Sequence, residues 1–112
     1  MPSLFDSVPS SPAEEVFTTL FEDGGVRIER IVSHRHASPD GFWYEPPHGE
    51  WLLLARGGAT LRLANPDEQV TLVPGDYLWL APGRRHRVEA TDAHTIWLAV
   101  HVRRDDASAV RT

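Results

Sequence analysis

The sequence predicts an all-β fold, namely a small antiparallel barrel or sandwich built from short strands. From residue 26 onward, apolar and polar residues alternate with period two in runs of four to eight residues. Gly, Pro, Asn or Asp separates these runs at regular intervals. A chain of 112 residues suits one compact core. We therefore expect a single β domain with short connections.

The segment before residue 26 has a different character. Residues 1–12 contain three Pro and four Ser, which predicts a loose arm. Ala13–Leu20 is expected to form one short helix, because Glu14 and Glu15 fall in its first turn, where the helix dipole favours them. The predicted organisation is an arm and helix over residues 1–25 packing on the barrel, a β-barrel over 26–102, and a polar tail over 103–112.

The periodic runs define eight candidate strands, each bounded by turn-forming residues. They are Val26–Val32, Phe42–Glu45, Trp51–Ala55, Ala59–Ala64, Gln69–Leu72, Asp76–Leu80, Arg85–Glu89 and Thr95–Val102.

Composition narrows the function classes. A formal charge of −5 gives no support to binding of nucleic acid or anionic membrane. The apolar runs are far too short to cross a bilayer, and the first residues lack the features of a secretory signal. The chain has no Cys, which excludes disulfides and thiolate catalysis and fits a reducing cytoplasm. We therefore expect a cytoplasmic protein that binds a small molecule.

Strand parity predicts which side chains face inward. Glu50 shares its parity with Leu52 and Leu54, and His86 shares its parity with Val88. A carboxylate among leucines is costly unless it is paired, hydrogen-bonded or coordinated, so Glu50 is a candidate site residue. The alternative is that Glu50 lies at the barrel rim in contact with solvent.

The same argument applied to other strands places Arg30 inside and two tryptophans outside. Arg30 has the parity of Val26, Ile28 and Val32, which would direct it to an anionic partner or ligand inside the barrel. Trp51 and Trp97 are expected to face outward. Two exposed indoles need a cover, which predicts a homodimer; the alternative cover is the N-terminal arm.

Two glycine-bounded segments carry a family resemblance. In the first, six residues separate Glu50 from Gly57; the second opens with Pro74-Gly75-Asp76 and ends with Gly83 and His86. Together they resemble the two signature motifs of the cupin superfamily, with Ala81 in place of the first Pro of a Pro-x-Gly. The resemblance implies a double-stranded β-helix, or jelly roll, with the short helix at its N-terminus. It is specific for fold and says little about function.

The resemblance also raises the question of a metal. Metal-binding cupins usually present His-x-His a few residues before the Glu, but here those positions hold Tyr44 and Pro46, or Trp43 and Glu45, depending on the alignment. Glu50 and His86 remain candidate metal ligands, and His48 or Glu45 could complete the set. Such a mixed imidazole–carboxylate set suits Zn, Fe, Mn or Ni. The alternative is that no metal binds.

Other residues are candidates for ligand contact or proton transfer. Trp43 and Tyr77, together with Arg30, are predicted to bind the ligand or cofactor, and Tyr44 or His34 to act as acid or base. His34 and His36 have matching parity and are a rival metal pair, with a solvated loop as the alternative. Two function classes follow: a small metal-dependent enzyme acting on a polar molecule, or a non-catalytic binding or sensor module with a degenerate metal site.

Overall fold

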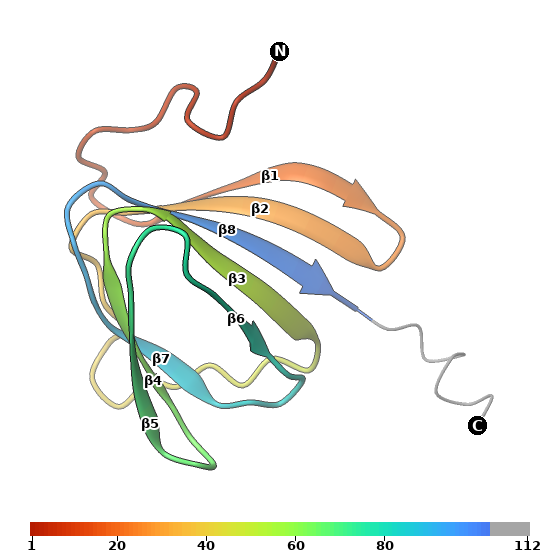
Figure 1. Cartoon of the computed structure of the whole chain (residues 1–112), viewed down its shortest axis with the longest axis vertical. Helices are drawn as coiled ribbons and strands as arrows, with labels where there is room; N and C mark the ends of the chain where they lie inside the picture. Colours follow the sequence, from red (N-terminus) through yellow and green to blue (C-terminus); the bar gives the residue numbers. More distant parts are fainter. Residues whose placement is uncertain (104–112) are drawn as a thin grey trace.

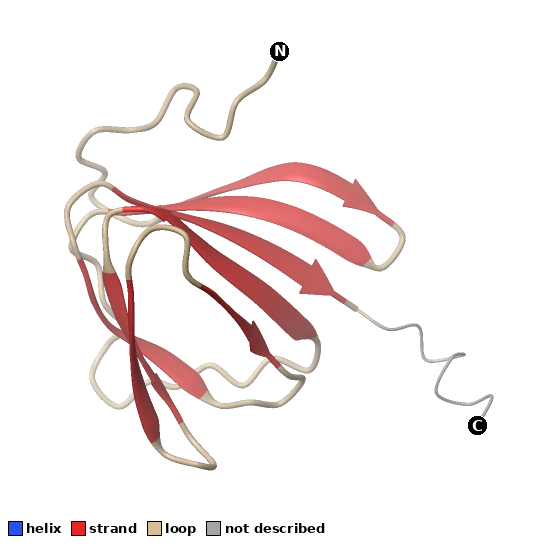
Figure 2. Ribbon diagram, in the orientation of Figure 1, coloured by secondary structure: helices blue, strands red, loops and turns tan. Residues whose placement is uncertain are grey.

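A computed structural model describes residues 1–103, and within them all regular structure is β-strand (Figure 2). The strands follow one another along the chain with only short connections, apart from the loop of residues 34–48. Their bounds are β1 Val16–Asp23, β2 Val26–Ser33, β3 Gly49–Arg56, β4 Ala59–Leu63, β5 Glu68–Leu72, β6 Tyr77–Leu80, β7 His86–Thr91 and β8 Thr95–Val102. The all-β prediction is confirmed.

The strands form two antiparallel sheets that face each other at an angle (Figure 1). The larger sheet has the order β1-β2-β8-β3-β6, and the smaller has the order β5-β4-β7. Every pairing between neighbouring strands is antiparallel. Strands β3 and β8 lie side by side although 38 residues, 57–94, separate them in sequence, so residues far apart in the chain meet on the inner face.

The core lies between the two sheets and is mainly aliphatic. Strands β3, β4 and β8 supply most of its buried side chains: Leu52, Leu54, Ala59, Leu61, Leu63, Trp97 and Ala99, to which Leu72 and Leu80 are added from β5 and β6. Burial of one such side chain contributes roughly 1.5–3 kcal/mol.

The N-terminal helix predicted over Ala13–Leu20 was wrong, because most of this segment belongs to strand β1. Val16, Thr18 and Thr19 are β-branched, and such residues favour a pleated strand. The strand pairs with β2 across a tight turn at Gly24 and Gly25. A Cβ on Gly25 would lie 2.2 Å from the carbonyl oxygen of Arg103, so this turn requires glycine. Strand β1 is therefore the edge strand of the larger sheet.

Every predicted strand except Phe42–Glu45 has a counterpart in the structure. Around Tyr44 the chain makes a single antiparallel bridge, in which its backbone pairs with that of His86. The following Pro46 and Pro47 have no backbone N–H groups to extend a ladder. This segment is therefore a loop fixed at one point.

The inward and outward faces of β2 and β8 are the reverse of the prediction. Trp97 is buried in the core, where its indole N–H donates to Ser33 Oγ at 3.1 Å. Arg30 faces outward and donates to the backbone carbonyls of Leu4 and Asp6 at 3.1 and 2.6 Å. The N-terminal arm therefore lies on the outer face of the larger sheet.

Trp51 does face outward, as predicted. Its ring lies 5.4 Å from that of Tyr77, and Trp79 occupies the paired position on β6.

Within residues 1–103 no helix has the length and apolar character needed to cross a bilayer. Apart from Arg103, the predicted polar tail of residues 103–112 lies outside the described residues.

Candidate functional site

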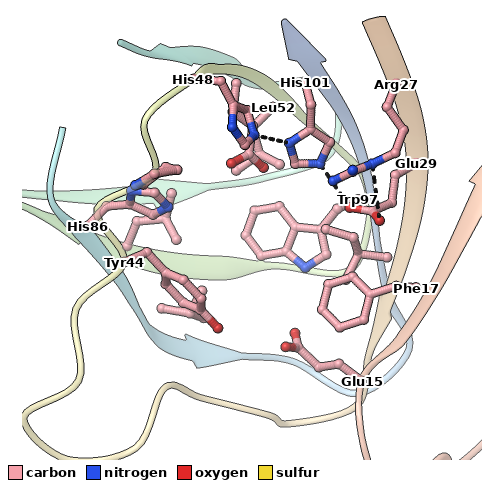
Figure 3. Close-up of a pocket in the computed structure, with 15 residues that line it drawn as sticks. Glu15, Phe17, Arg27, Glu29, Tyr44, His48, Leu52, His86, Trp97 and His101 are labelled. Carbon is pink, nitrogen blue, oxygen red and sulfur yellow. Dashed lines mark hydrogen bonds and ion pairs between the residues drawn. The ribbon is translucent and has the colours of Figure 1, made fainter. Parts of the chain in front are cut away.

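A cavity of about 230 Å³ opens between the two sheets (Figure 3). It is smaller than the pockets that take drug-sized ligands, which begin at roughly 300 Å³. Fifteen residues line it. They are Glu15, Phe17, Arg27, Glu29, Ile31, Tyr44, Pro46, His48, Glu50, Leu52, Leu61, His86, Val88, Trp97 and His101.

The lining is divided between an apolar and a polar part. Leu52, Leu61 and Val88 belong to the hydrophobic core or pack against it, and they supply an apolar wall. The polar part comes from adjacent strands of the larger sheet. Arg27 on β2 pairs with His101 on β8, and His101 pairs in turn with Glu50 on β3. This cross-strand row brings three ionisable side chains to one end of the cavity.

Glu50 is the second residue of β3 and faces the cavity, as parity predicted. Burial raises the pKa of its carboxyl above the usual value, while His101 and His86 act in the opposite direction. None of the hydrogen bonds or ion pairs within residues 1–103 uses this carboxyl. An acidic group in this position has lost part of its hydration without gaining a protein partner, which makes its charged form costly.

His86 also faces the cavity, with its ring fixed from two sides. Its Nδ1 lies 3.0 Å from the carbonyl oxygen of Arg84, and only a protonated nitrogen can bond to a carbonyl. The neutral imidazole therefore keeps its proton on Nδ1 and presents Nε2 as an acceptor.

The Tyr44 ring stacks on the His86 ring at 5.5 Å between centroids. Burial, and after it the charges of Glu15 and Glu50, raises the pKa of the Tyr44 hydroxyl.

A chain of hydrogen bonds joins three more side chains of the cavity wall. Glu29 Oε1 lies 2.9 Å from His101 Nε2, and His101 Nδ1 lies 3.3 Å from His48 Nε2 (Figure 3). Sequence analysis missed Glu29 and His101 because the parity of β2 and β8 was inverted. The available signal was that Glu29 and His101 share a face with Trp97 and Ser33, which form a buried pair.

The predicted metal ligands are only partly brought together. Glu50, His86 and His48 all line the cavity, whereas Glu45 is exposed and lies 3.9 Å from Arg85 in a surface ion pair. The ring of His48 turns toward His101. Among residues 1–103, no three His, Asp or Glu side chains form a group able to hold a metal ion.

The other predicted ligand-binding residues lie outside the cavity. The Arg85 guanidinium covers the Trp43 ring at 5.0 Å, and Tyr77 is two-thirds exposed on the outer face. Arg30 holds the N-terminal arm.

Tyr44 is therefore the only one of the two predicted acid–base residues in the lining. His34 packs edge-on against His94, with 5.0 Å between ring centroids. His36 Nδ1 accepts from the backbone N–H of His34, and its Nε2 lies 2.9 Å from the carbonyl oxygen of Ala13. The His34–His36 pair thus belongs to the loop that packs against the N-terminal arm, away from Glu50 and His86.

Comparison with known proteins gives matches among solved structures. A crystal structure described as a "putative mannose-6-phosphate isomerase" from Ralstonia eutropha superposes with a TM-score of 0.88; it is 40% identical, over 93% of this chain and 98% of that chain. No family model matches the sequence, and no curated protein matches it.

More distant structures share the fold alone. A cupin superfamily protein from Desulfitobacterium hafniense has a TM-score of 0.72 at 16% identity, over 87% of this chain and 84% of that chain. A protein with a double-stranded β-helix domain from Klebsiella pneumoniae has a TM-score of 0.73 at 19% identity, over 92% and 89% of the two chains.

Proposed function

The chain belongs to the cupin superfamily, and from that premise we propose that its barrel cavity binds a small, hydroxyl-bearing organic molecule. The observation that carries this proposal is the Glu50 carboxyl, which faces the cavity and has no partner within residues 1–103. A ligand hydroxyl would accept from the protonated carboxyl or donate to the ionised one. Binding would thereby offset the cost of burying this group.

The rest of the lining fits the same class of ligand. His86 Nε2 is an acceptor held in place by the Arg84 carbonyl, and the Tyr44 hydroxyl can donate or accept. Leu52 and Leu61 offer contact to the carbon skeleton. A ligand with several hydroxyl groups on a short carbon chain would use both parts of the cavity.

The name of the relative from Ralstonia eutropha suggests a first ligand, a hexose phosphate. Arg27 is the one Arg or Lys side chain among the lining residues, and it stands beside His101 and Glu29 at the polar end (Figure 3). A guanidinium is suited to binding phosphate. We therefore include both mannose and mannose 6-phosphate in the test below.

The family's metal cage does not fit this chain. The two His-x-His positions hold Tyr44 and Pro46, both of which line the cavity, and a phenol with a raised pKa and a proline are poor replacements for imidazoles. His48 is turned to His101. We therefore propose that side chains bind the ligand directly. The predicted divalent transition metal stays a prediction, which metal analysis of protein purified without added metal would test.

The test is a calorimetric titration of mannose, mannose 6-phosphate and related sugars into the protein. Glu50→Gln keeps the shape of the side chain and removes its charge, and Glu45→Gln is the matched control at an exposed position. We expect binding by the natural protein and by the control, with affinity weakened about tenfold in Glu50→Gln, because one hydrogen bond to a charged group contributes roughly 1.5–3 kcal/mol. Equal affinity in all three proteins would reject the role of Glu50.

Binding alone leaves two functions open, and the same ligands separate them. Incubation with a bound sugar and analysis for isomerised product distinguishes an enzyme from a non-catalytic binding module. The unpaired Glu50 carboxyl and the acceptor nitrogen of His86 lie at one cavity, which favours proton transfer on the ligand.

We also propose that the protein is a homodimer that pairs through the outer face of β3 and β6. The rings of Trp51 and Tyr77 contact each other there at a tilt of 33°, and Tyr77 and Trp79 are 66% and 51% exposed. Such a patch of aromatic side chains usually marks an interface. Sedimentation at micromolar concentration should give twice the chain mass, and Trp79→Glu should give a folded monomer. A natural protein that sediments as a monomer would reject the dimer.

A further inference from the structure

The hydrogen-bonded chain of Glu29, His101 and His48 has no part in the binding role of Glu50. We infer that this chain is a proton relay that makes His48 a base for a ligand in the cavity, an inference that rests on the proposed small-molecule site. Its three members come from β2, β8 and the loop that precedes β3. The fold therefore brings together residues separated by up to 72 positions.

The bond partners determine which nitrogens carry protons. A carboxylate only accepts hydrogen bonds, so His101 Nε2 donates to Glu29 Oε1 at 2.9 Å. A neutral His101 then has a lone pair on Nδ1, which accepts from His48 Nε2 at 3.3 Å. Neutral His48 is left with an unprotonated Nδ1, and no hydrogen bond within residues 1–103 uses that atom.

Burial keeps solvent from disturbing this arrangement. The side chains of Glu29 and His101 are only 12% and 13% exposed. Arg27 Nε lies 4.0 Å from Glu29 Oε2 and helps to hold the carboxylate in place. The His48 ring meets the His101 ring edge-on, with 5.3 Å between centroids. A carboxylate that orients one imidazole, which in turn orients a second, is the arrangement that fixes tautomers in catalytic and metal-binding sites.

The charges around His48 favour the neutral base. Burial lowers the pKa of His48, and the charges of Arg103 and Arg27 lower it further. Glu50 lies beside His101 in the β3–β8 ladder, and His86 also lines the cavity. Glu22, from β1, lines a smaller hollow behind His48 and His101 together with both arginines.

The proposed step conserves protons and electrons. A ligand C–H or O–H bond breaks, its proton goes to His48 Nδ1, and the electron pair stays on the ligand. The Nε2 proton of His48 passes to His101 Nδ1, which leaves an imidazolium against the Glu29 carboxylate. Return of the protons by the same path to the same or a neighbouring ligand atom gives exchange or isomerisation, with no further reactant required.

The relay is tested first in the ligand-free protein, by two-bond ¹H–¹⁵N correlation spectra of the histidine rings. We expect His101 and His48 both to carry the proton on Nε2. Glu29→Gln, which replaces an acceptor by an amide that can also donate, should convert His101 to a tautomer mixture and shift the His48 nitrogens. Glu45→Gln should leave both rings unchanged. His101 with its proton on Nδ1 in the natural protein would overturn the inference without any variant.

A second measurement separates failure of the relay from failure of the binding proposal. With the sugar phosphate of the binding assay in D₂O, His48→Gln should lower deuterium incorporation into the ligand about 10²-fold or more while the dissociation constant changes little. If no ligand binds but the tautomers are as expected, the result rejects the cavity proposal and supports the hydrogen-bonded chain. Unchanged exchange in His48→Gln, or stoichiometric zinc held by His48 and His101, would overturn the relay.

Discussion

Glu50 on β3 lies directly opposite His101 on β8, and both side chains face the cavity. The pairing is a consequence of sheet order, because β8 is inserted between β2 and β3. Glu50 and His101 are partners in the β3–β8 ladder, and each points inward from its own strand. One end of the cavity therefore combines an unpaired carboxyl with an imidazole that is tied to a second carboxylate.

The first prediction concerns Glu50 and pH. Because burial raises the pKa of Glu50 in the folded state, the folded protein binds a proton more tightly than the unfolded chain. The free energy of unfolding should therefore fall as pH rises from the unfolded pKa, about 4.3, through the raised folded value. Glu50→Gln should remove this loss, so that the variant gains stability over the natural protein above that window.

Urea unfolding at a series of pH values between 3 and 8 measures this difference. Glu45→Gln is the control, because Glu45 is exposed and only loosely paired with Arg85. A stability difference between Glu50→Gln and the natural protein that is the same at every pH would contradict the assigned cause.

The second prediction concerns Ser33, which is fully buried beneath Trp97. Its hydroxyl donates to a carboxylate oxygen of Glu15 and accepts from the Trp97 indole at 3.1 Å. Ser33→Ala leaves the buried indole N–H without a partner, at a cost of about 1–3 kcal/mol. Denaturation followed by tryptophan fluorescence should show this loss. A variant within about 0.5 kcal/mol of the natural protein would mean that the indole finds another partner.

The third prediction concerns the N-terminal arm. Arg30 donates to the carbonyls of Leu4 and Asp6, and the Phe5 ring lies under the Arg56 guanidinium at 4.4 Å. Arg30→Met should release the arm, and hydrogen exchange or limited proteolysis over residues 3–8 should become faster. Arg62→Met is the matched control, since Arg62 pairs with Asp67 at the surface far along the chain. An arm that stays protected in Arg30→Met would contradict the assignment.

The fourth prediction compares two motif glycines, Gly57 and Gly83. Both have positive φ, of 86° and 78°. A Cβ at Gly57 would also lie 2.7 Å from the Cα of Thr95, whereas a Cβ at Gly83 has no neighbour within 4 Å. Gly83→Ala should lower the free energy of unfolding by about 1–2 kcal/mol, the cost of a residue with a Cβ in left-handed backbone. Gly57→Ala should cost clearly more, and thermal unfolding that ranks the two variants equally would contradict the close approach to Thr95.

The sequence was sufficient for the strands and for one wall of the cavity. Period-two patterning located most strands, and the parity of Leu52 and Leu54 correctly directed Glu50 inward. The positions of Glu50 and His86 in the two motifs also agree with their place in the cavity lining.

The failures have two physical causes. The outer face of β8 is aliphatic, and period-two patterning alone favours such a face as the inner one, although Trp97 and His101 in fact point inward. Residues 4–6 of the arm hold Arg30 on the outer face, and no local pattern reveals such a long-range cover. A different contact, the hairpin with β2 across Gly24 and Gly25, makes the predicted helix a strand, β1.

We propose that the cavity bounded by Glu50 and His101 is the ligand site. Methyl-labelled protein titrated with the tightest-binding ligand tests it most directly, because Leu52, Leu61 and Val88 line the cavity whereas Val73 is exposed on the surface. We expect saturable shifts of the methyl groups of Leu52, Leu61 and Val88 and none at Val73. Shifts confined to the outer face, around Trp51 and Tyr77, would contradict it.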